Sequence, residues 1–487
     1  MDASTILETY KDKGLNEVPK CSLVNNCSLP YPCSELLTKE QLSPLIHRYY
    51  INSKEQAVHS KLKEICMMYP IVVIHGLTTA LEIDLDVFST ESLLKTNPNM
   101  PIDVLKQIKY SSDENWDTQQ KKKVWECFSH KSSSTIKNYA QYQAQTFLDD
   151  NDETVHDNIS TFSSPGQVTK DKEKRTVKFA TNVDLSVVEM WRPQLYELTK
   201  LPPFLKVECC DNMLTYVGYD ILGMNTIQVY MKVPGCKTTG HQENNNFCSV
   251  NINTGPGDCE WFAVSYEYWG TIHLLCAQAG VNYLSDSWWP PDLDVLHKNN
   301  VPVYRFLQKP GDIVWVNVGC VHWVCAIGLC NNVAWNVGPF TARQYELAIE
   351  RYEWNKQHKF KSIVPMMQLS WRLACMTKIS NQQLFHLIKN CLKQTMIYNY
   401  LILEFLKGKG VEVQHNNQLR KQAHYCKDCK AEVFNILFYK EAKNKDIFMV
   451  YCINCALIQS FSLERFDCFQ KYHMEELMEI YDKFSHC

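Results

Sequence analysis

Three residues whose side chains bind transition metals occur in a pattern that one metal ion can use. His241 and Glu243 are two positions apart, and His322 follows far downstream. In a β-strand, residues i and i+2 point to the same face, so His241 and Glu243 can bind one ion from one strand. Two histidines and one carboxylate form the facial ligand set of non-haem Fe(II) oxygenases, which leaves positions open for a co-substrate and O2. The pattern predicts an iron site, and the alternative is a buried hydrogen-bonded cluster.

Strands with polar side chains on one face are predicted around this motif. Residues 228–235 alternate before a Pro-Gly turn, which puts Tyr230 and Lys232 on the same face. A second alternating segment presents Ser249 and Asn251 on one face. A lysine inside a barrel is costly unless an anion pairs with it, and a dicarboxylate co-substrate would be such a partner. We therefore expect a ligand cavity beside the metal site, although Tyr230 is equally consistent with an ordinary barrel-filling aromatic.

Four cysteines in the C-terminal region have the spacing of a structural zinc site. They form two Cys-x-x-Cys pairs separated by 22 residues, namely Cys426, Cys429, Cys452 and Cys455. A four-thiolate tetrahedral site has no open coordination position, so it stabilises a fold and does not catalyse a reaction. The alternatives are two disulfides or a chance arrangement among the 22 cysteines of the chain.

Composition and charge limit the class of protein. The 487 residues are 45% apolar and 12% aromatic, which is typical of a globular protein with several domains. The net charge is only −3, so we expect no direct sequence-specific binding to nucleic acid. The first residues lack the pattern of a secretory signal, and no apolar run approaches the roughly 20 residues of a membrane span. We expect a reducing compartment, mostly free thiols and no membrane partner.

Longer motifs around these residues resemble the JmjC domain of the UTX/UTY group of histone H3 lysine-27 demethylases. The similar segments are YMKVPG at 230–235, GHQENNNFCSVNIN at 240–253, GPGDCEW at 255–261, NVPVYR at 300–305, CNNVAWNVGP at 330–339 and ERYEWN at 350–355. The similarity covers most of residues 70–487. It implies a mainly β fold with α-helices, in which a JmjC double-stranded β-helix, or jelly-roll (cupin) barrel, carries helical elements and a C-terminal zinc-binding module.

The resemblance implies an Fe(II)- and 2-oxoglutarate-dependent dioxygenase that also consumes O2. Such an enzyme would hydroxylate the N-methyl groups of tri- and dimethylated lysine 27 of histone H3 and release formaldehyde. Its expected partners are the histone H3 tail and chromatin-modifying complexes, and its expected location is the nucleus. Two alternatives keep the same fold: a catalytically weak histone-binding scaffold, and a 2-oxoglutarate-dependent protein hydroxylase.

The resemblance also implies a role for each candidate residue. It assigns iron to His241, Glu243 and His322, and structural zinc to the four cysteines. Tyr230 would contact the methylated lysine of the substrate. Lys232 and Thr238 would hold the far carboxylate of 2-oxoglutarate. The contacts nearer the metal would be made by Ser249 and Asn251.

Changes in composition divide the chain into six predicted segments. The first segment has little periodicity, and the third is acidic, then rich in Ser and Gly, then basic. The predicted segments are a loosely ordered arm at 1–40, a mixed helical segment at 41–147, a disordered linker at 148–175, the jelly-roll catalytic domain at 176–370, a helical linker at 371–415, and the zinc module with a closing helix at 416–487.

Overall fold

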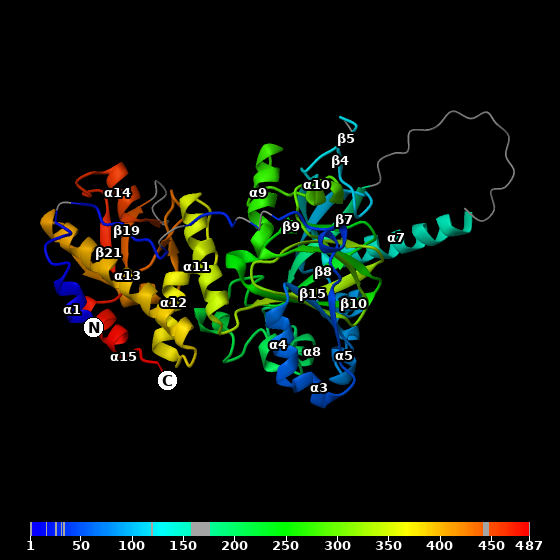
Figure 1. The fold of residues 1–487 in the computed structure, drawn as a ribbon, viewed down its shortest axis with the longest axis horizontal. Helices are drawn as coiled ribbons and strands as arrows, with labels where there is room; N and C mark the ends of the chain where they lie inside the picture. Colours follow the sequence, from blue (N-terminus) through cyan, green and yellow to red (C-terminus); the bar gives the residue numbers. More distant parts are fainter. Residues whose placement is uncertain are drawn as a thin grey trace.

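Two β-sheets form one half of the molecule, and a helical bundle with a small four-cysteine module forms the other half (Figure 1). The computed structural model describes residues 2–15, 17–24, 27–30, 32, 35–117, 120–156, 176–441 and 448–486. The long helix α11 leads from the barrel into the second half of the molecule (Figure 1). The candidate metal centre lies in the first half, between the two sheets.

The larger sheet has nine strands and the smaller sheet has four. In spatial order the larger sheet consists of β1 (His47–Tyr50), β2 (Ile71–His75), β13 (Ile313–Val316), β10 (Cys248–Pro256), β15 (Cys330–Val337), β8 (Gln228–Lys232), β7 (Thr176–Asp184), β3 (Pro101–Ile108) and β6 (Ser129–Thr135). The smaller sheet consists of β12 (Tyr304–Gln308), β11 (Cys259–Val264), β14 (Val321–Ala326) and β9 (Lys237–His241). Only β1 and β2 pair in parallel; all other pairs in these two sheets are antiparallel.

Strand β13 is apolar at every position because both of its faces are buried. Val314 and Val316 belong to the core between the two sheets. Ile313 and Trp315 point the other way, into the core beneath the outer helices. Successive side chains of a strand alternate between the faces of a sheet, so a strand that is buried on both faces needs apolar residues at every position.

Helices cover the outer faces of both sheets. On the larger sheet these are α3 (Lys54–Val58), α4 (Ser60–Met68), α5 (Leu77–Ala80), α6 (Thr90–Thr96), α7 (Ile136–His156) and α8 (Arg192–Leu198). On the smaller sheet they are α9 (Trp269–Gln278) and α10 (Leu293–Lys298). Helix α7 continues through residues 148–156, so the predicted linker is wrong for that part. The rest of that predicted linker, 157–175, lies outside the described residues.

Three helices form the bundle that follows the barrel. They are α11 (Ala342–Gln357), α12 (Met366–Met376) and α13 (Gln382–Gly408). The Asn381 side chain accepts a hydrogen bond from the Leu384 amide and so caps the start of α13. Apolar residues at helical spacing, among them Ile388, Leu392 and Met396, are fully buried against the neighbouring helices. These packed faces make the bundle a firm support for the last module.

The four-cysteine module has a small sheet flanked by two helices. Its strands in spatial order are β16 (Val413–His415), β21 (Asp467–Gln470), β19 (Ile436–Glu441) and β20 (Phe448–Tyr451). A second pair is formed by β17 (His424–Tyr425) and β18 (Glu432–Val433), and the helices are α14 (Ile453–Gln459) and α15 (Met474–Lys483).

The N-terminal segment is anchored to the end of the chain, so the predicted loose arm is wrong there. Helix α1 (Ala3–Glu8) buries Ala3, Ile6 and Leu7 in the core that also holds α13 and α15. The Ala3 amide donates to the Asp482 carboxylate at 2.8 Å, and Figure 1 shows the N-terminus beside α15. A helix of six residues is too short to produce a readable period in the sequence.

Candidate metal centre and cavity

The three candidate iron ligands converge from two neighbouring strands of the smaller sheet. His241 ends β9, and His322 on β14 lies directly opposite it in the antiparallel register. The possible ligand atoms of His241, Glu243 and His322 all lie within 4.8 Å of one another. Glu243 Oε1 is 3.9 Å from His241 Nε2 and 3.5 Å from His322 Nε2. Both imidazoles therefore present the same nitrogen to the space beside the carboxylate.

Glu243 does not share a strand with His241 as the spacing predicted. Strand β9 ends at His241, and Glu243 precedes the 3-10 turn Asn244–Asn246. Its backbone remains extended, with φ −58° and ψ 149°. The side chains two positions apart still point to the same side, because only the hydrogen-bond pairing of the strand has stopped.

Backbone carbonyls fix the orientation of both imidazoles. His241 Nδ1 lies 2.8 Å from the Thr239 carbonyl, and His322 Nδ1 lies 3.2 Å from the Cys320 carbonyl. A carbonyl oxygen can only accept, so each Nδ1 must carry the proton and donate it. The Nε2 atom of each ring is then free of a proton and can bind a metal.

Burial and mutual interactions keep these groups in the forms that bind metals. Burial first, and then the neighbouring His322, lower the pKa of His241 to about 4. Burial alone would raise the pKa of Glu243, but the neighbouring His322 and His241 and the amide of Asn336 lower it to about 2. At neutral pH the centre therefore holds a neutral His241 and an ionised Glu243. Metal ligands must be deprotonated in this way.

Two neighbours of the centre were missed in the sequence. Asn336 on β15 donates its amide to Glu243 Oε2 at 3.0 Å and to the Cys248 carbonyl at 3.1 Å. The Trp261 ring stacks on His322 with centroids 5.7 Å apart. For Asn336, the signal in the sequence was a polar residue inside a buried strand. Its partner Glu243 lies 93 positions away in the sequence, so the contact could not be predicted from that signal.

A cavity between the two sheets contains every barrel residue that the sequence singled out. Its wall on the larger sheet consists of Tyr230, Lys232, Ser249, Asn251 and Ala334. Its wall on the other side consists of Thr238, His241, Glu243, Trp261, His322 and Val324. The residues share one cavity because β8 and β10 both neighbour β15, while β9 and β14 pair across from them.

Lys232 is a buried cation without a carboxylate partner among the described residues. Its side chain is 3% exposed, and its Nζ lies 5.6 Å from the centre of the Phe179 ring. On β10, which is separated from the Lys232 strand by β15, Asn251 Oδ1 accepts from Asn332 at 3.0 Å and from Gln308 at 3.3 Å. The amide nitrogen of Asn251 is therefore the atom that can serve a ligand in the cavity. A buried cation next to an amide donor suits an anionic ligand.

The four cysteines of the C-terminal module form a second cluster. Their Sγ atoms all lie within 4.8 Å of one another, and Cys429 and Cys452 are 3.7 Å apart. A tetrahedral zinc site with Zn–S bonds of about 2.3 Å requires sulfur atoms about 3.8 Å apart. One pair follows β17 and the other begins α14, so a metal would join two ends of the module. The spacing fits one zinc ion.

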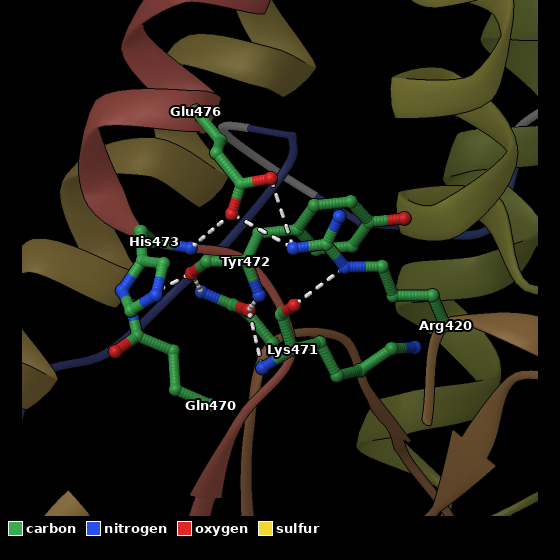
Figure 2. Close-up of polar contacts among 7 residues, drawn as sticks. Arg420, Gln470, Lys471, Tyr472, His473 and Glu476 are labelled. Atoms are coloured by element: carbon green, nitrogen blue, oxygen red, sulfur yellow. Dashed lines mark hydrogen bonds and ion pairs between the residues drawn. The ribbon is translucent and has the colours of Figure 1, made fainter. Parts of the chain in front are cut away.

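Arg420 connects this module to its closing helix. Figure 2 shows the guanidinium facing the Glu476 carboxylate, with Nη2 2.9 and 2.7 Å from its two oxygens. Its Nε donates to the Lys471 carbonyl at 2.6 Å, and the group lies 4.2 Å above the Tyr472 ring. Glu476 also accepts the His473 amide at the start of α15. A single arginine thus fixes the position of the helix on the module.

A buried carboxylate joins the module to the helical bundle. Glu432 on β18 accepts the amides of Met367 and Gln368 at the start of α12, at 3.0 and 2.8 Å. Lys471 donates to the Gln368 side chain at 3.2 Å. Burial raises the pKa of Glu432 to about 7, although the two amides and Lys471 act in the opposite direction. The bundle and the module therefore share a polar contact that has little access to water.

The fold and both clusters place the protein in a known class. Residues 228–337 match the sequence model of the JmjC domain, hydroxylase. Residues 344–399 match the C-terminal helical domain of lysine-specific demethylase 6/UTY, and residues 415–474 match the domain described as KDM6, GATA-like. These matches confirm the predicted JmjC fold and the resemblance to the UTX/UTY group. Residues 344–399 and 415–474 thus carry domains of the lysine-specific demethylase 6/UTY family, after a JmjC domain at residues 228–337.

Curated relatives agree with this assignment. The chain is 46% identical over 463 residues to human Lysine-specific demethylase 6B, a match that covers 93% of this chain and 28% of that protein. It is 29% identical over 455 residues to Lysine-specific demethylase jmjd-3.1 of Caenorhabditis elegans, covering 89% of this chain and 43% of the relative. The chain thus spans less than half the length of either relative. None of the described helices is long and apolar enough to cross a membrane.

Proposed function

We propose that this chain is an Fe(II)- and 2-oxoglutarate-dependent histone lysine demethylase that acts on tri- and dimethylated lysine 27 of histone H3. The cavity carries the proposal, because it combines the facial ligand set with a buried lysine that has no carboxylate partner among the described residues. The family and the names of the relatives support lysine demethylation. The choice of lysine 27 rests on the resemblance to the UTX/UTY group.

The donor set fits Fe(II). His241 and His322 each offer an unprotonated Nε2, and Glu243 offers a carboxylate oxygen, all on one side of the cavity. Iron bound by these ligands would activate O2 with 2-oxoglutarate and supply the oxidising chemistry for hydroxylation of an N-methyl group, after which formaldehyde is released. The task of the protein is to orient the ligands and to hold both substrates. Asn336 fixes the Glu243 carboxylate by occupying its second oxygen.

Lys232 and Thr238 would bind the far carboxylate of 2-oxoglutarate. The two residues line the cavity on opposite sheets, so a dicarboxylate between them would bridge the barrel. A charge-assisted hydrogen bond in a dry cavity is short and strong. Ser249 and the Asn251 amide line the same cavity and would contact the co-substrate nearer the metal. These four residues would set the direction in which the co-substrate reaches the iron.

Tyr230 would contact the methylated lysine. Burial first, and then the nearby Glu243 carboxylate, raise the pKa of its phenol, so the hydroxyl keeps its proton at neutral pH. That hydroxyl donates to Gln228 Oε1 at 3.1 Å, which holds the ring in place. An aromatic ring with an oxygen acceptor attracts a methylammonium cation. The residue thus suits a cationic substrate better than a neutral one.

The four-cysteine module would bind structural zinc and help to hold the H3 tail. It is connected to the bundle through Glu432 and to α15 through Arg420. Both links are independent of the barrel ligands. A role on histone tails would place the protein in the nucleus, together with chromatin-modifying complexes.

One incubation distinguishes this function from its alternatives. Purified protein is mixed with Fe(II), 2-oxoglutarate and methylated H3 peptides, and the peptide mass is measured. Loss of one methylene mass per methyl group supports demethylation. A stable gain of one oxygen would instead identify a protein hydroxylase, and an unchanged mass with tight peptide binding would identify a scaffold. The same reaction with Glu243→Ala is the control for contaminating enzymes.

A further inference from the structure

Gln242 lies between two candidate iron ligands, and its amide joins four parts of the molecule. Its Oε1 accepts from the Tyr283 hydroxyl at 2.8 Å and from the Arg351 guanidinium on α11. Its Nε2 donates to the Gly319 carbonyl at 2.6 Å. Gly319 belongs to the turn that leads to His322 on β14. One side chain therefore connects the segments that carry all three ligands to a helix outside the barrel.

The turn at Gly319 is held to the other ligand segment at a second point. Its amide donates to the Asn246 carbonyl at 3.2 Å, in the 3-10 turn that follows Glu243. Gly319 has φ +66°, and a Cβ there would lie 2.4 Å from the Tyr266 ring. Both the backbone conformation and the lack of space therefore require glycine. The distance between the two ligand segments is thus set by contacts on both sides of this turn.

Arg351 is an unusual residue for this position. Its side chain is 4% exposed, and no carboxylate in the described part of the chain lies within ion-pair distance of it. The guanidinium stacks on Trp269, 4.2 Å from the ring centre. Burying an unpaired cation costs several kcal/mol, so an ordinary packing role would be better filled by an apolar side chain.

The chemistry of the guanidinium explains what an arginine does there. A glutamine amide can rotate by half a turn and exchange its oxygen and nitrogen at little cost. Arginine has donors only, so a rotated amide would direct its NH2 group at another donor. The Tyr283 hydroxyl cannot enforce this alone, because it can also accept. Arg351 at the Gln242 oxygen and the Gly319 carbonyl at its NH2 group therefore favour the same orientation of the amide, and Arg351 is the side chain that enforces it.

We propose that Arg351 is a positioning residue for the metal centre: it orients the Gln242 amide, which holds the segment of His241 and Glu243 at a fixed distance from the turn that leads to His322. The inference rests on the proposed function, since it assumes that these ligands bind a divalent metal. It extends the site to α11, the helix that continues into the helical bundle. Residues that orient metal ligands typically change metal affinity by about 10- to 100-fold when they are replaced.

The test measures Co(II) affinity, which needs neither turnover nor a peptide. Arg351→Met keeps an unbranched, flexible side chain, although a shorter one, and removes its donors, so we expect Co(II) to bind about 10- to 100-fold more weakly. Arg351→Lys keeps one donor, and we expect it to recover part of the loss. Arg192→Met is the control, because this arginine lies at an exposed position at the start of α8, on the outer side of the larger sheet.

Gln242→Met keeps the inference falsifiable if Arg351→Met fails to fold, and a double-mutant cycle adds a second test where both variants fold. Gln242→Met removes the amide that contacts Gly319 and leaves Arg351 in place. If Arg351 acts through this amide, adding Arg351→Met to Gln242→Met should cause little further loss of Co(II) affinity. Unchanged Co(II) affinity in folded Arg351→Met or Gln242→Met, or fully additive losses, would overturn the inference alone. A wild-type barrel that binds no Co(II) would overturn the metal site in the proposed function, and this inference with it.

Discussion

The two candidate metal centres of the chain differ in what the metal does for the fold. The barrel centre takes its ligands from segments far apart in the sequence, held by two large sheets, so its geometry exists before a metal binds. The four-cysteine cluster takes its ligands from two local pairs in a module with few strands. We therefore expect that removing metal from the barrel abolishes activity without unfolding it, whereas removing metal from the four-cysteine module lowers the stability of that module.

Replacing a barrel ligand should give the largest effect on activity with the smallest effect on folding. We expect His241→Ala or Glu243→Ala to abolish demethylation, because two ligands do not complete the facial set. The melting temperature should change little, since the sheets are packed by other residues. Enzyme assays and calorimetry on protein of known metal content test this, with exposed His130→Ala as control. Near-normal turnover by either ligand variant would refute the iron assignment.

Replacing a cysteine of the four-cysteine module should have the opposite effect, with a large loss of stability and a small loss of catalytic rate. Cys426→Ser or Cys452→Ser should remove zinc, lower the stability of the C-terminal module and raise the KM for peptide more than it lowers kcat. Iron in the barrel should remain, because no barrel ligand has changed. Metal analysis beside kinetics distinguishes the cases, with Cys375→Ser at an exposed position as control. A wild-type protein without zinc would reduce the cluster to a packing feature.

Lys232 allows a sharper test of how the barrel cavity binds its co-substrate. Lys232→Ala should remove a charge-assisted hydrogen bond of about 1.5–3 kcal/mol and weaken 2-oxoglutarate binding by about ten- to hundredfold. The matched control is Lys237→Met, a lysine that is just as buried but donates to the Glu114 carbonyl. If Lys237→Met, and not Lys232→Ala, raised the 2-oxoglutarate requirement, the cavity would have been assigned the wrong cation.

Glu432 gives a smaller effect, seen in the pH dependence of stability. Its pKa is about 7 in the folded protein against an ordinary value of 4.5, so the folded state binds this proton more tightly. This carboxyl therefore destabilises the fold above pH 7, and the penalty disappears as pH falls towards 4.5. Wild-type protein should gain up to about 3 kcal/mol on acidification relative to Glu432→Gln. Parallel unfolding curves for the two proteins across this window would contradict the buried-carboxylate account.

The sequence predicted what depends on local spacing. The Cys-x-x-Cys pairs and the alternation that directs Lys232 and Tyr230 into one cavity could be read directly, because side-chain direction in a strand follows from position. The same rule grouped the candidate ligands His241 and Glu243, although Glu243 lies just beyond the end of the strand. The match to known domains then supplied the jelly-roll topology, which periodicity alone does not determine.

Contacts that cross between elements could not be read in this way. Asn336 reaches Glu243 from another strand, and Arg351 reaches Gln242 from a helix beyond the barrel. Each depends on strand order and helix placement, which no local pattern encodes. The buried helix α1 was missed because tertiary contacts stabilise it, and six residues carry almost no intrinsic helical preference.

The most direct test of the central claim is the position of methyl loss on one peptide. An H3 peptide carrying trimethyl-lysine at position 27 and at a second position is incubated with wild-type protein, Fe(II) and 2-oxoglutarate, and fragmented in a mass spectrometer. We expect methyl loss at lysine 27 that depends on 2-oxoglutarate and is absent with Glu243→Ala. An iron-loaded wild-type protein that leaves lysine 27 fully methylated would contradict it.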